Sequence, residues 1–458
     1  MSSLPEADAR RSALKILDLV AEGAPFDSAR DRAVDGLGDR DRRLAHELAA
    51  GVLRQQQRLD DTLSPHVARG IGSVQPRLRR ILELGAYQLT SLDRVPAHAA
   101  VNVCVELARD TGGEKAAGFV NAVLRKVGLE RALEDSQTVT GGREGPKGLP
   151  CGRGKQSRDS VAPPEGRGLA HQYSHPGWLV ERWLQHFGVA ETKALLEWNN
   201  RKPPLIVQPA RASLPELDEN FEAAGVAAST APYGAGLVVG ASQPKDLPGY
   251  ERGDFVVQDA AQALVARYAD LPEGCTVIDA CAAPGGKSIA LGRVAGRVIA
   301  ADRSRARVGR LALNLARAGS GHAWPVVAAA EHPPVRDIDA ALLDAPCLGT
   351  GTFARHPDAR HRVRPAVLRE LAAQQRVLLE GLAAAVRRGG LLVYATCSLE
   401  PEENEQQVTR FLAAHPEYRR EPSTAVPPEL RSAAGDLVLL PQRHGTDGAF
   451  AARLRRTA

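Results

Sequence analysis

The chain has 458 residues, more than one ordinary domain, so we expect two or three domains. Its formal net charge of +5 permits a polyanionic partner without requiring one, and no window approaches about 18 uncharged apolar residues, which excludes a membrane-spanning helix. The six cysteines form no C-x-x-C pair, which argues against a structural zinc site and against a disulfide framework.

The N-terminal part of the chain has a helical pattern. Its first residues lack a basic segment followed by an apolar run, so we expect no secretory signal and a cytoplasmic protein. Apolar residues then recur at helical spacing from residue 8 to about 130, as in Leu44, Leu48 and Val52. We therefore predict a compact all-helical domain at residues 1–135.

The middle of the chain divides into a linker and a small domain. Residues 136–170 are rich in Gly and Pro, which predicts a flexible linker. A helix carrying Trp178 and Trp183 follows, and the apolar run 205–207 then predicts a strand. Residues 171–255 are thus predicted to form a small α/β domain that binds substrate.

From residue 256 onward, strand patterns alternate with helical ones. The predicted strands are 276–279, 297–302, 338–344 and 391–395, with helices from 287, around 311–315 and near 366–387. This order predicts a Rossmann-like, doubly wound parallel sheet in residues 256–458, and such sheets bind ligands at the carboxyl ends of their strands. Asp279, Asp302, Asp344 and Cys397 fall at or just past such ends, so we expect them on one rim.

A glycine loop follows the first of these strands. Its residues are Cys281-Ala282-Ala283-Pro284-Gly285-Gly286-Lys287. Gly285 and Gly286 allow the backbone to approach a ligand, but the loop matches neither G-x-G-x-x-G nor the Walker pattern. Asp302 ends the next strand about 20 residues on, where an acid can bind ribose hydroxyls. The pattern favours a nucleoside cofactor without a pyrophosphate, such as S-adenosylmethionine; the alternative is an ordinary tight turn, with Asp302 as a helix N-cap.

Cys347 and Cys397 suit nucleophilic attack on carbon. Cys347 follows Asp344-Ala345-Pro346, and Cys397 lies in Thr396-Cys397-Ser398, settings that place both thiols at the ends of elements. A thiolate that adds to C6 of cytosine makes C5 nucleophilic enough to accept a methyl group, provided that an acid supports N3. Asp344 is placed to do so if it is protonated or shares a proton. The alternative is that the cysteines are ordinary small buried residues.

These motifs closely resemble those of the bacterial 16S ribosomal RNA (cytosine-5) methyltransferases of the Sun/Fmu type. The matching segments are 279–288, 344–347, 396–398, 401–404 and 446–448, together with 40–48, 96–102 and 118–125 of a NusB-like RNA-binding domain. The resemblance implies that residues 281–287, Asp302 and Asp344 contact S-adenosylmethionine. It also implies that Cys397 is the nucleophile and that Cys347 assists product release or proton removal. The implied partner is small-subunit ribosomal RNA; because the target base must be unstacked, we expect naked or partly assembled RNA, bound by a monomer.

Other interpretations stay open. DNA cytosine methyltransferases use the cysteine of a Pro-Cys motif, so Cys347 is a rival nucleophile. The chain could instead methylate transfer RNA by the same chemistry. It could also be a non-catalytic RNA-binding factor for assembly or antitermination.

The chain departs from the family pattern at three places, one of which is a Gly-rich linker that is longer than the resemblance leads us to expect. The family's Asp after the third strand is replaced near Ala329, which predicts weaker cofactor binding unless Glu331 substitutes for it. Arg360-His361 stand where the family has Lys-Trp. For Pro401-Glu402-Glu403-Asn404, which matches the family, we expect helix capping and an indirect role in positioning Cys397.

Overall fold

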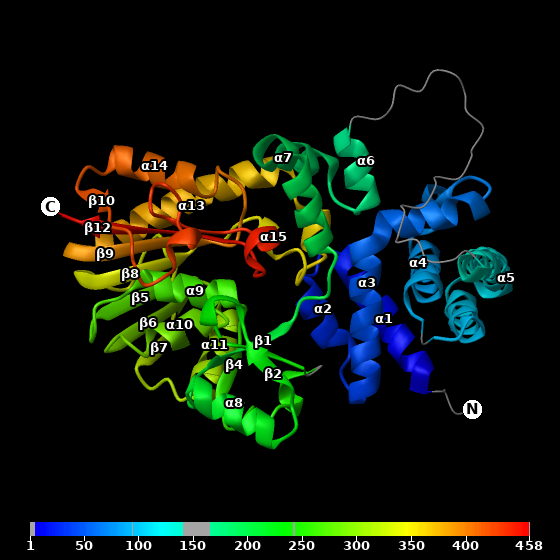
Figure 1. The fold of residues 1–458 in the computed structure, drawn as a ribbon, viewed down its shortest axis with the longest axis horizontal. Coiled ribbons are helices and arrows are strands. Elements are labelled where there is room, and N and C mark those ends of the chain that lie inside the picture. The colour runs from blue at the N-terminus through cyan, green and yellow to red at the C-terminus, as the bar shows by residue number, and fades with distance from the viewer. Residues whose placement is uncertain (1–4, 94, 141–164, 241–242, 458) are drawn as a thin grey trace. The chain divides into compact units, whose positions relative to one another are not determined.

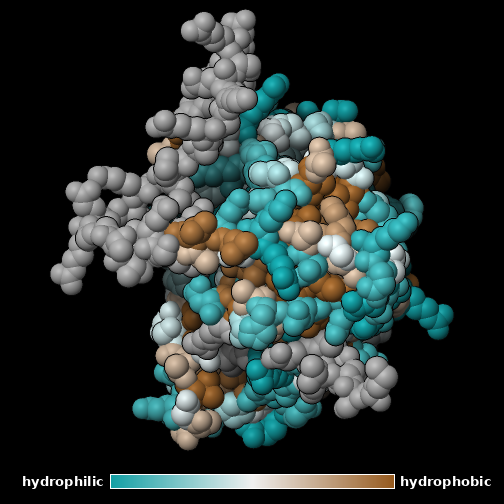
Figure 2. Space-filling view, turned by 90° about the vertical axis from the view of Figure 1, so that its right-hand side faces the viewer, coloured by the Kyte–Doolittle hydropathy of each residue, from teal (hydrophilic) through white to brown (hydrophobic). Residues whose placement is uncertain are grey.

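The computed structural model describes residues 5–93, 95–140, 165–240 and 243–457 (Figure 1). The chain divides into two compact units, Met1–Asn200 with His356–His361 and Arg201–Arg355 with Arg362–Ala458. No helix in the described ranges combines the length and apolar character needed to cross a bilayer. In the face drawn in Figure 2, hydrophobic residues lie in patches among hydrophilic ones, as on ordinary protein surfaces.

The first unit is helical, as predicted. Its elements are α1 (Pro5–Ala21), α2 (Phe26–Ala33), α3 (Asp39–Leu63), η1 (Ser64–His66), η2 (Ile71–Ser73), α4 (Pro76–Ser91), α5 (Ala97–Thr140), α6 (Glu165–Gln172) and α7 (Gly177–Asn199). The periodic residues Leu48 and Val52 lie in its core. Gly112 and Gly113 interrupt α5 with non-helical backbone, so this element behaves as two helices. Residues 141–164 of the predicted linker lie outside the described residues.

The segment His356–His361 belongs to this helical unit. Arg360 is fully buried, and its guanidinium donates to the Asn199 carbonyl at 2.8 Å and to Asn200 Oδ1 at 2.7 Å. His361 Nε2 lies 2.9 Å from the carbonyl oxygen of Leu53. Burial lowers the pKa of Arg360 to about 9. Arg360 is therefore buried in the helical unit, and the half-buried His361 contacts the same unit.

The second unit begins with a small antiparallel sheet. Its elements are β1 (Leu205–Pro209), α8 (Leu214–Ala223), β2 (Ala228–Thr230), η3 (Pro232–Gly234), β3 (Leu237–Val239), η4 (Pro244–Asp246) and β4 (Phe255–Val257). The strand order is β2-β3-β1-β4. Leu217 and Phe221 of α8 pack on Val207 and Phe255 of the sheet. This sheet falls within the small α/β region predicted at 171–255, whereas helix α7 (Gly177–Asn199), which carries Trp178 and Trp183, belongs to the first unit.

A larger sheet follows, and its elements alternate as predicted. They are α9 (Ala260–Ala269), β5 (Thr276–Ala280), α10 (Gly286–Leu291), β6 (Arg297–Asp302), α11 (Arg305–Arg317), β7 (Ala323–Val327), β8 (Ile338–Asp344), η5 (Thr350–Thr352), α13 (Pro365–Ala385), β9 (Val386–Thr396), α14 (Glu405–Ala414), β10 (Tyr418–Arg420), η6 (Pro428–Leu430), β11 (Leu437–Leu439), α15 (Pro441–His444) and β12 (Ala449–Arg456). The short helix α12 (Ala359–Arg362) comes between η5 and α13 in the chain, but all except its last residue belong to the first unit. The strand order is β10-β12-β9-β8-β5-β6-β7, with β11 on β12.

The order confirms the Rossmann-like fold and adds one feature. The neighbouring strands are parallel from β9 through β8, β5 and β6 to β7. Beyond β9, strand β12 is antiparallel to β9, and β10 and β11 are antiparallel to β12. The sheet is therefore mixed rather than wholly parallel. The added strands cover β9, so the strand that precedes Cys397 is paired on both sides.

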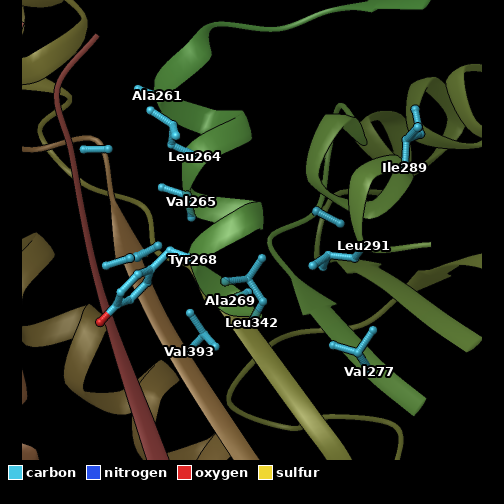
Figure 3. Packing of buried hydrophobic residues seen from close by; sticks show 14 of the residues in the cluster. Ala261, Leu264, Val265, Tyr268, Ala269, Val277, Ile289, Leu291, Leu342 and Val393 are labelled. Atoms are coloured by element: carbon cyan, nitrogen blue, oxygen red, sulfur yellow. The ribbon is translucent and has the colours of Figure 1, made fainter. Parts of the chain in front are cut away.

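Helices cover both faces of this sheet (Figure 1). Side chains alternate between faces along a strand, so Leu342 of β8 packs in the core beneath α9 while Leu343 packs in the core beneath α13. Figure 3 shows Leu264, Val265 and Tyr268 of α9 over the sheet residues of the first core. Because both faces are buried, the rim at the strand ends is the part of the sheet open to ligands.

Candidate active site

Four predicted residues lie along one rim of the large sheet. Asp279 is in β5, Asp302 ends β6 and Asp344 ends β8, while Cys397 directly follows β9. These strands are parallel neighbours in the order β9-β8-β5-β6, so their carboxyl ends meet at the same edge. Strand adjacency thus brings together residues that are far apart in the sequence.

The glycine loop after β5 has a backbone that only particular residues can follow. Gly285 has φ +112°, in the left-handed region, and a Cβ there would lie 2.7 Å from the Leu311 side chain. A Cβ on Gly286 would meet the Gln258 side-chain amide at 2.7 Å. The Ala282 amide donates to the Ala301 carbonyl at 2.9 Å, which ties the loop to β6. The loop is therefore held as a cradle beside the ends of β5 and β6.

Two buried carboxylates near this loop can still accept further hydrogen bonds. Asp279 Oδ2 accepts from the Ser288 hydroxyl at 2.5 Å, and burial raises the pKa of Asp279 to about 7. Asp302 Oδ1 accepts from the Ser304 amide at 3.0 Å, while its Oδ2 lies 3.2 Å from an Arg307 guanidinium nitrogen. Among the described residues, Asp279 Oδ1 and Asp302 Oδ2 accept no hydrogen bond. Such acceptors fit hydroxyl or ammonium groups of a ligand.

The structure argues against Asp302 as a mere helix cap. Ser304 is the N-cap residue of α11, and its side chain accepts from the Arg307 amide. Asp302 instead lies two residues before that cap and is 1% exposed. A buried carboxylate at a strand end suits ligand binding better than capping.

Lys287 is a buried residue rather than a solvated one. It is 8% exposed, and its ammonium donates to Asp344 Oδ2 at 2.7 Å and also to the Gln262 side-chain carbonyl. The Asp344 side chain remains 31% exposed. The glycine loop is thereby connected to the end of β8, and a hydrogen-bonded cation–carboxylate pair faces the rim.

The two thiols predicted to carry the chemistry lie side by side. Cys347 Sγ and Cys397 Sγ are 3.4 Å apart, and both residues are partly exposed. They follow β8 and β9, which pair in register at Asp344 and Ala395. The hydrogen bond to Cys397, together with burial, raises the pKa of Cys347 well above its ordinary value. Either sulfur of the pair can donate the hydrogen bond that joins them.

Residues 401–404 were predicted to cap a helix and to help position Cys397 indirectly; the capping part is wrong, and the positioning part stays a prediction. Helix α14 begins at Glu405, and its N-cap residue Asn404 makes no side-chain capping hydrogen bond. The Asn404 amide instead contacts both neighbours of Cys397, Thr396 and Ser398. The local pattern indicated a helix start, but tertiary contacts claim these side chains.

A buried ion cluster supports the loop after Cys347, and the sequence did not reveal it. Arg355 donates to Asp447 Oδ2 at 2.8 Å and to Asp259 Oδ2 at 2.5 Å. The next residue after Asp447 is Gly448, whose amide donates to the Gly351 carbonyl at 2.8 Å. Asp259 and Asp447 of this cluster are 188 residues apart in the chain, so only the folded structure brings them together.

Metal binding is not indicated by the side chains that the structure describes. Within those residues, no group of three or more His, Cys, Asp or Glu could hold a metal ion. The rim therefore offers thiols, carboxylates and one buried ammonium as its chemical groups.

Comparisons with known proteins agree with this geometry. Residues 267–455 match the family described as 16S rRNA methyltransferase RsmB/F, residues 7–128 match the NusB family, and residues 175–244 match the ferredoxin-like domain of RsmF/B-like methyltransferases. The chain is 37% identical to the probable ribosomal RNA small subunit methyltransferase B of Synechocystis sp., over 98% of this chain and 99% of that protein.

Two further matches cover nearly the whole chain. Identity to the ribosomal RNA small subunit methyltransferase B of Vibrio cholerae is 32%, over 98% of this chain and 97% of that protein. The crystal structure of PH0851 aligns with a TM-score of 0.78 and 25% identity, over 99% of each chain. With a NusB-like helical region, a ferredoxin-like region and a thiol pair on a Rossmann-like rim, this chain belongs to the 16S rRNA methyltransferase RsmB/F family.

Proposed function

We propose that this protein transfers a methyl group from S-adenosylmethionine to C5 of one cytosine in small-subunit ribosomal RNA, through a covalent bond between Cys397 and C6. The observation that carries the proposal is the pair of thiols 3.4 Å apart, on the same rim of the sheet as the Lys287–Asp344 pair. The names of the relatives, ribosomal RNA small subunit methyltransferases B, support the choice of RNA.

Cys397 is the nucleophile in this proposal. A thiolate is the reactive form of cysteine, and it is stabilised when a neighbouring thiol donates a hydrogen bond to it. The Cys347 thiol, with its sulfur 3.4 Å away, can donate that bond, and we assign Cys397 as the sulfur that receives it. Its thiolate adds to C6 of the cytosine, and the C5–C6 electron pair moves toward C5 and the ring.

The Lys287–Asp344 pair supports the negative charge that develops in the ring. Addition at C6 raises the basicity of N3, which then needs a proton or a hydrogen bond. The Lys287 ammonium holds its proton against Asp344 Oδ2, at the end of the strand beside β9. We assign N3 protonation to this pair as a unit, because a shared proton serves both groups.

The cofactor fits the cradle formed by residues 281–287 and the buried acids. Asp302 Oδ2 and Asp279 Oδ1 are buried acceptors without hydrogen bonds from the described residues, and they suit ribose hydroxyls and an amino group. Gly285 and Gly286 keep the loop backbone free of side chains. When bound, S-adenosylmethionine supplies the electrophilic methyl group.

Cys347 assists the last step. A base takes the C5 proton, its electron pair restores the C5–C6 double bond, and the bond between C6 and the Cys397 sulfur breaks. The departing sulfur carries the electron pair as a thiolate. The Cys347 thiol, 3.4 Å away, donates to it and thereby favours release of the methylated RNA.

The proposal is tested by methyl transfer from labelled S-adenosylmethionine to protein-free small-subunit RNA, with transfer RNA as a parallel substrate. Wild type should label one cytosine at C5 in the ribosomal RNA, and Cys397→Ser should label none. If only transfer RNA were labelled, the substrate would be transfer RNA and not ribosomal RNA. Persistent labelling by Cys397→Ser would move the nucleophile to Cys347, and tight RNA binding without labelling by wild type would favour a non-catalytic binding factor.

A further inference from the structure

The backbone on each side of Cys347 is held by one buried side-chain pair. Gln375 Nε2 donates to the Pro346 carbonyl at 2.9 Å, before the cysteine. The Glu403 carboxyl accepts from the Leu348 amide at 3.1 and 3.2 Å, after it. Gln375 Nε2 also donates to Glu403 Oε1 at 3.0 Å, so the two side chains form one clamp. Both are fully buried, which leaves the clamp little freedom.

Asn404, the residue after Glu403, contacts both neighbours of Cys397. Asn404 Oδ1 accepts from the Thr396 hydroxyl at 2.5 Å, before the cysteine. Asn404 Nδ2 donates to the Ser398 carbonyl at 2.9 Å, after it. A third contact, from the Gly351 amide to the Cys397 carbonyl at 3.0 Å, comes from the loop that follows Cys347.

Glu403 and Asn404 are adjacent, and each holds the loop of a different cysteine. The Tyr394 hydroxyl donates to the Glu403 carbonyl at 2.6 Å and anchors this dipeptide to β9. We propose that Glu403 and Asn404 are positioning residues that together set the separation of the two thiols, Glu403 through Cys347 and Asn404 through Cys397. This deepens the proposed function, on which the assignment of the two chemical steps rests.

The two residues should fail in different ways. Loss of the Glu403 contacts frees the Cys347 loop and leaves Cys397 held, so attack continues while release slows and the covalent RNA adduct accumulates. Loss of the Asn404 contacts frees Cys397 itself, so adduct formation slows. A substitution that only weakens the fold would lower both steps together.

The first test needs no RNA and no cofactor. Diamide takes up two hydrogens as two neighbouring thiols form a disulfide, so the rate of Cys347–Cys397 bond formation reports their separation. We expect Glu403→Ala and Asn404→Ala to form this disulfide at least tenfold more slowly than wild type, measured by peptide mass. Glu403→Gln retains an acceptor for the Leu348 amide and should oxidise like wild type, as should the exposed control Glu405→Ala.

If Asn404→Ala fails to fold, Asn404→Asp replaces it in the test. It has the shape of Asn but loses the donor to the Ser398 carbonyl, so oxidation should again slow. Near-ultraviolet circular dichroism verifies that each variant is folded. Oxidation of the folded Glu403→Ala and Asn404→Asp variants at the wild-type rate would overturn the positioning role.

The second test uses stoichiometric RNA and labelled S-adenosylmethionine. Glu403→Ala should accumulate the covalent adduct severalfold above wild type on a denaturing gel, Asn404→Asp should show less adduct than wild type, and Glu403→Gln should restore turnover. Equal adduct levels in the two variants would overturn the division of labour between them. Absence of methylation by wild type would refute the proposed function, whereas the diamide rates would still decide the positioning.

Discussion

The sulfur atoms of Cys347 and Cys397 lie 3.4 Å apart, although the residues are separated by 50 positions in the chain. Adjacent parallel strands, β8 and β9, deliver them to the same rim, and buried side chains hold the backbone around each one. At this distance the hydrogen bond to Cys397 raises the pKa of the Cys347 thiol, so Cys347 does not titrate independently of its neighbour.

Oxidation should join the two thiols and inactivate the protein reversibly. We expect diamide to produce one intramolecular Cys347–Cys397 disulfide and to abolish methyl transfer, and a thiol reductant to restore it, because the nucleophilic sulfur is consumed. Peptide mass and activity are followed in the same sample. Cys347→Ser cannot form this bond, so retention of its single-turnover methylation under diamide is the matched control. Inactivation of that variant at the wild-type rate would contradict the prediction.

Gly351→Ala should destabilise the fold and displace Cys397. A Cβ at this position would lie 2.6 Å from Gly448 Cα and 2.9 Å from the Cys397 carbonyl, so backbone must move. Overpacking of this kind costs about 1–3 kcal/mol, measured by urea unfolding. Gly309 in α11 is exposed and has open space around its Cα, so Gly309→Ala should leave stability unchanged or raise it. Equal stabilities of the two variants would refute the steric argument.

Lys287→Met should slow the chemical step more than it weakens cofactor binding. The substitution removes the proton donor beside Asp344 and leaves the apolar length of the side chain. Acid–base catalysis contributes about 100-fold or more, so we expect a comparable loss of single-turnover rate at saturating S-adenosylmethionine. The exposed Lys245→Met serves as the control. A Lys287→Met rate within about threefold of wild type would remove this pair from the mechanism.

Ala329→Asp should tighten cofactor binding. Ala329 follows β7, and the amide of its neighbour Ala328 donates to the Asp302 carbonyl at 3.2 Å, so the position adjoins the acid that ends β6. One added hydrogen bond contributes about 1 kcal/mol, a gain of roughly fivefold in affinity. Isothermal titration calorimetry measures it. An unchanged affinity would mean that the residue at position 329 does not limit cofactor binding.

Glu403 should make stability depend on pH. Burial, the largest cause, raises the pKa of Glu403 to about 7 from 4.5, so the native state binds a proton more tightly than the unfolded state. Its contribution is then complete below pH 4.5 and is lost as pH rises toward about 7. This corresponds to at most about 3 kcal/mol.

Glu403→Gln removes that titration. The stability of Glu403→Gln minus that of wild type should therefore grow as pH rises from about 5 to about 7 and level off above it. Urea unfolding across this range measures the difference. A difference that is constant with pH would show that the carboxyl does not titrate in this window.

Local sequence patterns predicted much of the fold. Apolar spacing marked the helical N-terminal region, and the alternation of strands and helices marked the Rossmann-like sheet, because each pattern reflects neighbours within a few residues. Glycine at 285 and 286 marked the loop, since its backbone and packing leave no space for a side chain. Asp302, Asp344 and Cys397 each come at or just after the end of a predicted strand, which placed them at a rim of the sheet. Their roles stay predictions.

Long-range contacts account for what the sequence left open. The sequence predicts an indirect role for residues 401–404 in positioning Cys397, but no local pattern identifies the contacts that Asn404 makes. The same holds for the hydrogen bond from Gln375 to Pro346, because its two residues belong to different elements that meet only in the folded chain. The residues 401–404 looked like a helix start for the same reason, since acids and proline near a helix suit capping locally. The sequence identifies which side chains can carry the chemistry. The 3.4 Å distance between the two sulfurs depends on the order of the strands and on buried hydrogen bonds, which only the tertiary structure decides.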